Sequence, residues 1–84
     1  MAKVFVVFQD GKRLSEYNIK GWERDTFLSF REAVKRAYQW AYPLEESDIN
    51  TLVSNSLSDW KLGEAKDLGM TEVPVLMHIA EEEV

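Results

Sequence analysis

Residues 4–8 form an unbroken apolar run, Val-Phe-Val-Val-Phe. β-branched and aromatic residues favour strands, and a run without polar positions is typical of a strand that is covered on both faces. Residues 9–12, Gln-Asp-Gly-Lys, predict a tight hairpin, because both central positions of such a turn need positive φ and Asp-Gly tolerates it. Residues 13–19 are half polar, so we expect a second strand there, antiparallel to the first and nearer the sheet edge.

The clearest helical periodicity lies in residues 30–41. Apolar side chains recur there at the spacing of one helix face, at Phe30, Ala33, Val34, Ala37, Tyr38 and Ala41. Ser29 and Glu32 have the spacing of a capping box at the helix start, and Asp25 or Thr26 offers an alternative, earlier cap. The three alanines on the apolar face predict that the helix packs closely on a sheet.

Pro43 ends this helix, and the segment that follows it, residues 44–62, allows two interpretations. A helix would bury one set of apolar residues, Ile49, Leu52, Val53, Leu57 and Trp60. Alternation is also present, at Ile49, Thr51 and Val53. Several residues in the segment favour turns over a helix interior, namely Ser54, Asn55, Ser56 and Ser58. We therefore predict a short strand at 50–54, a turn, and a shorter strand at 59–62.

The last part of the chain ends in a second apolar run. Residues 63–71 suggest a loop with a single helical turn that ends at Gly69. Residues 73–80 are almost wholly apolar and predict the final strand, with Pro74 tolerated because it lies at the strand's beginning. The glutamates at 81–83 form a charge run, which is typical of a solvated tail.

The two apolar runs, at 4–8 and 73–80, predict that the first and last strands lie side by side in the middle of a sheet. With a right-handed crossover, this gives an α+β fold with a mixed four- to five-stranded sheet packed on one α-helix, in the order β-β-α-β-β-β. The segments that define this order are the hairpin at 4–19, Asp25-Thr26-Phe27, Tyr42-Pro43, and residues 62–70. Their order resembles the ubiquitin-like β-grasp superfamily. Ubiquitin-type modifiers end in Gly-Gly, whereas this chain ends in Glu81-Glu82-Glu83-Val84, so we do not expect conjugation.

Length and composition limit the domain organisation and the compartment. The 84 residues suffice for one domain but not two, so we expect a single domain at 1–80 and an acidic tail at 81–84. The chain has no cysteine, which leaves no disulfide and no thiolate metal site and favours a reducing cytoplasm. The apolar run at 4–8 is far shorter than a signal-peptide core or a membrane span. A net charge of −5 disfavours nucleic acid and anionic lipid as partners.

Few residues are candidates for chemistry. His78 is the only histidine, and metal sites built on nitrogen and sulfur ligands need several such groups, so we interpret it as a structural or surface histidine. Glu45, Glu46 and Asp48 form the tightest internal acidic cluster but match no calcium-loop spacing, so we expect a solvated turn. The four glycines are too scattered to form a phosphate-binding loop. We therefore predict a protein that is not an enzyme and that holds no metal or cofactor.

The candidate partner-binding surface combines basic and aromatic residues, Arg31, Lys35, Arg36, Trp40, Trp22 and Trp60. The basic residues form a polar row opposite the alanine face of the helix, which is also how an ordinary solvated helix face looks. Trp40 lies off the buried stripe, and the other two tryptophans lie outside the helix. Aromatic residues held at a surface are common binding anchors, although caps over the edge of a small core explain them equally well.

The leading hypothesis is a small non-catalytic protein–protein interaction module or accessory subunit that acts by docking. It rests on small size and on the lack of catalytic groups. An alternative is an acidic inhibitor or decoy, of the kind encoded by phages and mobile elements, which blocks a host nucleic-acid-binding protein with phosphate-like charge. An enzyme whose site is shared with a partner chain is the third class.

Overall fold

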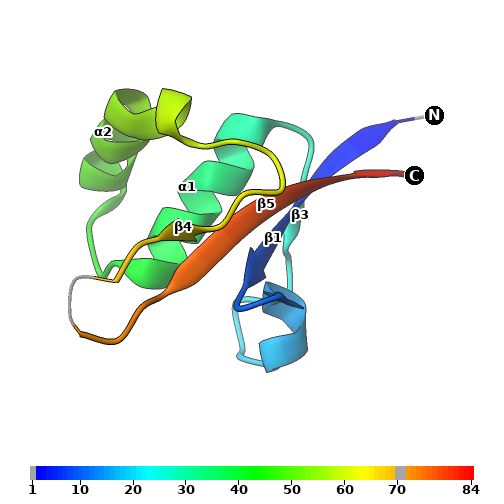
Figure 1. The fold of residues 1–84 in the computed structure, drawn as a ribbon, viewed down its shortest axis with the longest axis horizontal. Coiled ribbons are helices and arrows are strands. Elements are labelled where there is room, and N and C mark those ends of the chain that lie inside the picture. The colour runs from blue at the N-terminus through cyan, green and yellow to red at the C-terminus, as the bar shows by residue number, and fades with distance from the viewer. Residues whose placement is uncertain (1, 70–71) are drawn as a thin grey trace.

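The computed structural model, which describes residues 2–69 and 72–84, has an antiparallel sheet and two α-helices (Figure 1). The strands are β1 (Lys3–Gln9), β2 (Lys12–Arg13), β3 (Thr26–Phe27), β4 (Lys66–Asp67) and β5 (Leu76–Glu83). The helices are α1 (Phe30–Ala41) and α2 (Glu46–Ser56), with short 3₁₀ turns η1 (Leu14–Tyr17) and η2 (Leu57–Asp59). The predicted α+β class is therefore confirmed. In the described ranges, neither helix is long and apolar enough to cross a membrane.

The centre of the sheet is the pair of strands β1 and β5, in the order β2-β1-β5-β4, with β3 also paired to β1. The prediction that the first and last strands lie side by side is confirmed. They pair antiparallel, however, from Lys3↔Glu83 to Gln9↔Met77, so the predicted mixed sheet is wrong. Between β3 and β4 the chain forms the two helices, and β4 then pairs antiparallel with β5. Strand β5 therefore runs beside β1 in the opposite direction. A β-grasp is not confirmed by this topology.

Helix α1 forms where the periodicity predicts it. Its N-cap is Ser29, whose Oγ accepts a hydrogen bond from the backbone N–H of Glu32 at 3.1 Å. Ala33 and Ala37 on its inner face are fully buried, and α1 packs against β1, β3 and β5. The small side chains therefore allow the close approach to the sheet that the alanines predicted.

The segment after α1 corrects the prediction of two short strands at 50–54 and 59–62, because α2 occupies Glu46–Ser56. Ile49 and Val53 lie four residues apart on one face of α2 and are buried against α1. Ser56 is accommodated because its Oγ donates to the Leu52 carbonyl at 2.6 Å. Burial of one helix face thus outweighs weak local propensity, and the helical interpretation holds.

Strand β2 is much shorter than the strand predicted at 13–19. The chain leaves the sheet after Lys12–Arg13 and forms η1. Leu14 is fully buried in the core, and Ser15 bonds to the carboxylate of Asp25 through its backbone N–H and its hydroxyl. Both contacts draw the chain away from the sheet edge and towards the core. The half-polar sequence of residues 13–19 did not predict them.

The C-terminal third differs from the prediction in two places. Residues 66–67 form β4 instead of a helical turn ending at Gly69; residues 70–71 of the predicted loop lie outside the described residues. Strand β5 starts at Leu76, later than predicted, and continues to Glu83. The residues predicted as a solvated tail belong to this strand, because Glu81 pairs with Phe5 and Glu83 pairs with Lys3.

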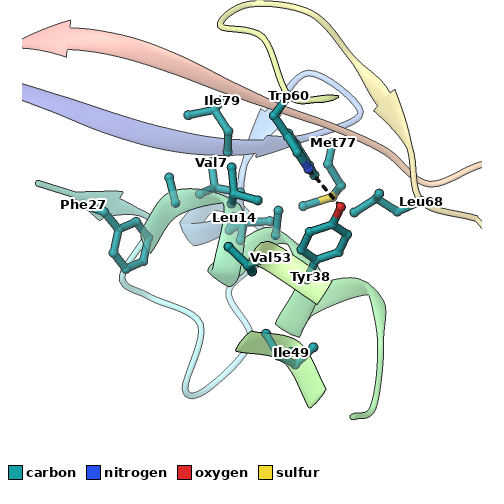
Figure 2. Close-up of a cluster of buried hydrophobic side chains, with 13 residues drawn as sticks. Val7, Leu14, Phe27, Tyr38, Ile49, Val53, Trp60, Leu68, Met77 and Ile79 are labelled. Atoms are coloured by element: carbon teal, nitrogen blue, oxygen red, sulfur yellow. Dashed lines mark hydrogen bonds between the residues drawn. The ribbon is translucent and has the colours of Figure 1, made fainter. Parts of the chain in front are cut away.

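The hydrophobic core lies between the sheet and the two helices (Figure 2). Tyr38 of α1 and Trp60, which follows η2, meet inside it, and the Trp60 indole N–H donates to the Tyr38 hydroxyl at 3.0 Å. That hydroxyl also shares a hydrogen bond with Ser56 Oγ at 2.6 Å. The polar ends of two large aromatic side chains are thereby satisfied within an apolar environment.

The Asp-Gly hairpin turn is confirmed, with φ of 51° at Asp10 and 80° at Gly11 between the paired residues Gln9 and Lys12. A Cβ at Gly11 would meet no atom within 4 Å, so a substitution there strains the backbone without a steric clash. We expect Gly11→Val to lower the free energy of unfolding by roughly 1 kcal/mol or more, because a β-branched residue disfavours positive φ. Gly11→Asn should cost less, since asparagine tolerates this region. Equal urea midpoints for the two variants would contradict the assigned turn.

Candidate functional site

A groove of about 360 Å³ lies beside α1. Its lining combines α1 residues with one residue of β3 and one of the connection before it, and consists of Arg24, Phe27, Glu32, Lys35, Arg36 and Gln39. Lys35 and Arg36 each lie three or four positions from both Glu32 and Gln39, which places the four residues on one side of the helix. The groove therefore contains three basic side chains in a chain whose net charge is negative.

Arg36 is held in place by aromatic and backbone contacts. Its guanidinium carbon lies 4.0 Å from the ring centroid of Trp22, and its Nη2 donates to the Gly21 carbonyl at 2.6 Å. The buried Nε has no hydrogen-bond partner in the described part of the chain. Burial and the nearby charge of Arg24 lower the pKa of Arg36, and Glu23 opposes them. This guanidinium is thus partly desolvated and close to a like charge.

The tryptophans predicted as anchors support Arg36 or belong to the core. Trp22 packs edge-on against Trp40 at 5.0 Å between centroids, and Trp40 contacts Tyr17 at 5.4 Å. Trp22 and Trp40 are half-buried and pack against the core. Trp60 is only 4% exposed, so it offers no surface to a partner. Trp22 therefore lies directly under Arg36 and is itself supported by Trp40, which packs against Tyr17.

Arg24, from the connection before β3, also lines the groove. Its guanidinium carbon lies 4.9 Å from the Phe27 ring centroid, and its Nε donates to the Thr26 carbonyl at 3.4 Å. Within residues 2–69 and 72–84, neither Arg24 nor Arg36 forms an ion pair with a carboxylate. The structure thus brings together two guanidinium groups whose charges are not neutralised by a direct partner.

Of the predicted basic row, Lys35 and Arg36 line the groove and Arg31 lies outside it. Lys35 lines the groove but is paired with Glu46 of α2 at 2.8 Å, and this contact lowers the pKa of Glu46. Arg31 is not part of the lining and donates to Ser54 Oγ at 2.9 Å. Sequence reasoning missed Arg24, because it lies in an aperiodic connection that carries no pattern of its own.

The connection that carries Trp22 and Arg24 is anchored by Asp25, which is 4% exposed. Its carboxylate accepts two hydrogen bonds from Arg13 at 3.2 Å each, two from Ser15, and one from Thr26 Oγ1 at 3.1 Å. Burial alone would raise the pKa of Asp25, but these donors outweigh it and lower the pKa from 3.8 to about 2. Its backbone carbonyl also accepts from Val7 N–H at 3.0 Å.

Arg13 also covers the face of the sheet that lies away from the helices. Its guanidinium reaches from Asp25 and Thr26 to Glu82, which lies 3.7 Å from Nη1. Val6 lies between these partners in the register, paired with Thr26 and Ala80, and is fully buried. The partners of Arg13 thus lie on both sides of β1 at a buried apolar residue that is not part of the core cluster between the sheet and the helices.

The remaining candidate groups are dispersed. His78 stacks on Phe8 at 4.6 Å between ring centroids, and burial lowers the pKa of this histidine. Glu45, Glu46 and Asp48 are exposed at the start of α2, where the predicted solvated turn is replaced by a helix N-terminus. No group of three histidine, aspartate or glutamate side chains that could hold a metal ion is present among the described residues.

Comparison with protein-family models, with curated proteins and with solved structures gives no match to this chain.

The Asp25 network predicts a pH-dependent loss of stability. The folded-state pKa of about 2 lies below the ordinary 3.8, so the ionised carboxylate stabilises the fold above about pH 4 and less as the pH falls towards 2. Asp25→Asn should therefore lower the free energy of unfolding by about 2 kcal/mol at neutral pH. The difference between the two proteins should shrink near pH 2 in urea unfolding curves.

Asp59→Asn is the matched control, because Asp59 is exposed and the same chemical change there removes no buried contact. It should leave the unfolding curve nearly unchanged at both pH values. A difference between wild type and Asp25→Asn that is as large near pH 2 as at pH 7 would contradict the ionised state of Asp25.

Proposed function

We propose that this chain is a non-catalytic docking module or accessory subunit that binds an acidic segment of another protein in the α1 groove. The observation that carries the proposal is the pair of guanidinium groups of Arg24 and Arg36, which face one groove without a carboxylate partner among the described residues. Charge-assisted hydrogen bonds from arginine to carboxylate are among the strongest polar contacts available to proteins. Burial and the charge of Arg24 both lower the pKa of Arg36, and a carboxylate bound between the two arginines would offset both effects.

Preorganisation supports the same proposal. Arg36 is fixed on Trp22 and bonded to Gly21, so little side-chain freedom is lost when it meets a ligand. Arg24 rests on Phe27 next to the anchored Asp25. Aromatic support and a cationic rim are common features of protein interfaces.

The charge distribution favours a short acidic protein segment over nucleic acid. Glu32 lines the groove, Glu23 lies near Arg36, and the whole chain carries a net charge of −5. A long polyanion would therefore be repelled by most of the surface, whereas one or two carboxylates contact only the guanidinium groups. The positive groove also favours docking over the acidic-decoy alternative at this site.

The direct test is titration with an acetylated, amidated oligoglutamate peptide, followed by NMR. We expect shifts at the amides of Arg24 and Phe27 and at the guanidinium of Arg36, and binding that weakens as salt is raised. Arg24→Glu should weaken binding by at least about tenfold while leaving the fold intact, because Arg24 is exposed.

Lys61→Glu is the matched control, with the same charge change at an exposed residue outside the groove lining. It should reduce binding only slightly. Equal losses in the two variants would show nonspecific charge attraction, and shifts confined to other surfaces would place the site elsewhere. Tighter binding of a single-stranded oligonucleotide than of the peptide would also overturn the proposal.

A further inference from the structure

At the outer end of β5, one backbone edge has no pairing partner among residues 2–69 and 72–84. Backbone hydrogen bonds join Ala2 to Val84 in both directions, and Asp10 N–H donates to the Leu76 carbonyl. Hydrogen-bonded pairs alternate along an antiparallel ladder, so the even-numbered residues of β5 face β1. The backbone groups of Met77, Ile79, Glu81 and Glu83 therefore point to the opposite side of β5.

The outward groups are covered only along the first part of the strand. Met77 pairs with Lys66 of β4, and the Ile79 carbonyl accepts from Gly63 N–H at 2.8 Å. Beyond that point, no described segment pairs with the outward N–H and C=O groups of Glu81 and Glu83. Figure 1 shows the paired ends of β1 and β5 extending past the helices. An unpaired edge of this kind is a template for an added strand.

The charges on this edge define what it can accept. Glu81 is paired with Lys3 at 3.2 Å and Glu82 with Arg13 at 3.7 Å, whereas Glu83 has no ion pair within residues 2–69 and 72–84. A second copy of the chain, adding its own β5 edge, would place glutamates opposite glutamates. Like charges directly across a strand pair are destabilising, so self-pairing is disfavoured.

We propose that an extended segment of another protein, with lysine or arginine at alternate positions, adds to β5 at Glu81–Glu83 as a further strand. Its backbone pairs with the four outward groups, and its basic side chains lie opposite Glu81 and Glu83 on the same face of the sheet. This site is separate from the α1 groove and takes a ligand of the opposite charge. The two proposals therefore stand or fall independently.

The probe is an acetylated, amidated peptide of about eight residues that alternates lysine and valine. By NMR we expect shifts at the amides of Glu81 and Glu83 and slower hydrogen exchange of both amides, because each becomes hydrogen-bonded. The same peptide with alternate backbone amides N-methylated keeps its charge but cannot pair, and it should bind at least about tenfold more weakly.

The double variant Glu81→Lys, Glu83→Lys should abolish binding of the lysine peptide. The double variant Glu45→Lys, Asp48→Lys is the control, because it makes the same charge change at the start of α2, away from the sheet. It should still bind the peptide. Equal binding of the N-methylated peptide would overturn the proposal, as it would show attraction by charge alone. Shifts away from β5, no binding by the wild-type protein, or concentration-dependent dimers that protect Glu81 and Glu83 would overturn it too. If the β5 variant does not fold, the binding of the unmodified and N-methylated peptides to the wild-type protein still tests whether the peptide pairs with the backbone of β5.

Discussion

The buried carboxylate of Asp25 is the interaction on which the arrangement of the candidate site depends. An ionised carboxylate removed from water is costly unless charged and neutral donors replace its hydration. Arg13, Ser15 and Thr26 supply those donors from β2, η1 and β3. Three short elements, each too small to be stable alone, are thereby joined beside β1.

The groove follows from this anchor. The connection that leads from η1 to β3 carries Trp22 and Arg24, and its end is fixed where Asp25 bonds to Arg13 and to the Val7 backbone. Trp22 then meets α1, where Arg36 lies on its ring. A connection without regular secondary structure can thus present two arginines in a defined geometry, because a buried polar network replaces the hydrogen bonds of a strand.

The sequence predicted the elements whose signal is local and periodic. Phe30–Ala41 has helical spacing and a serine cap, and Asp10-Gly11 has the residues of its turn, so both formed as expected. Residues 46–56 form a helix instead of the predicted strand. Their serines favour turns, but packing against α1 stabilises the helix. Lys35 and Arg36 were found from helix spacing, but Arg24 was missed, because its position depends on the distant contact between Asp25 and Arg13. Polar contacts between residues far apart in the sequence produce no periodic pattern from which they could be predicted.

The most direct test of this account is the titration of the Asp25 carboxyl carbon by NMR in protein labelled with ¹³C. The contacts from Arg13, Ser15 and Thr26 predict a midpoint near pH 2, below the ordinary 3.8. Asp59, an exposed aspartate in the same spectrum, serves as the internal reference. A midpoint for Asp25 at or above 3.8 would show that the carboxylate is not held by these donors and would contradict the anchoring of the groove.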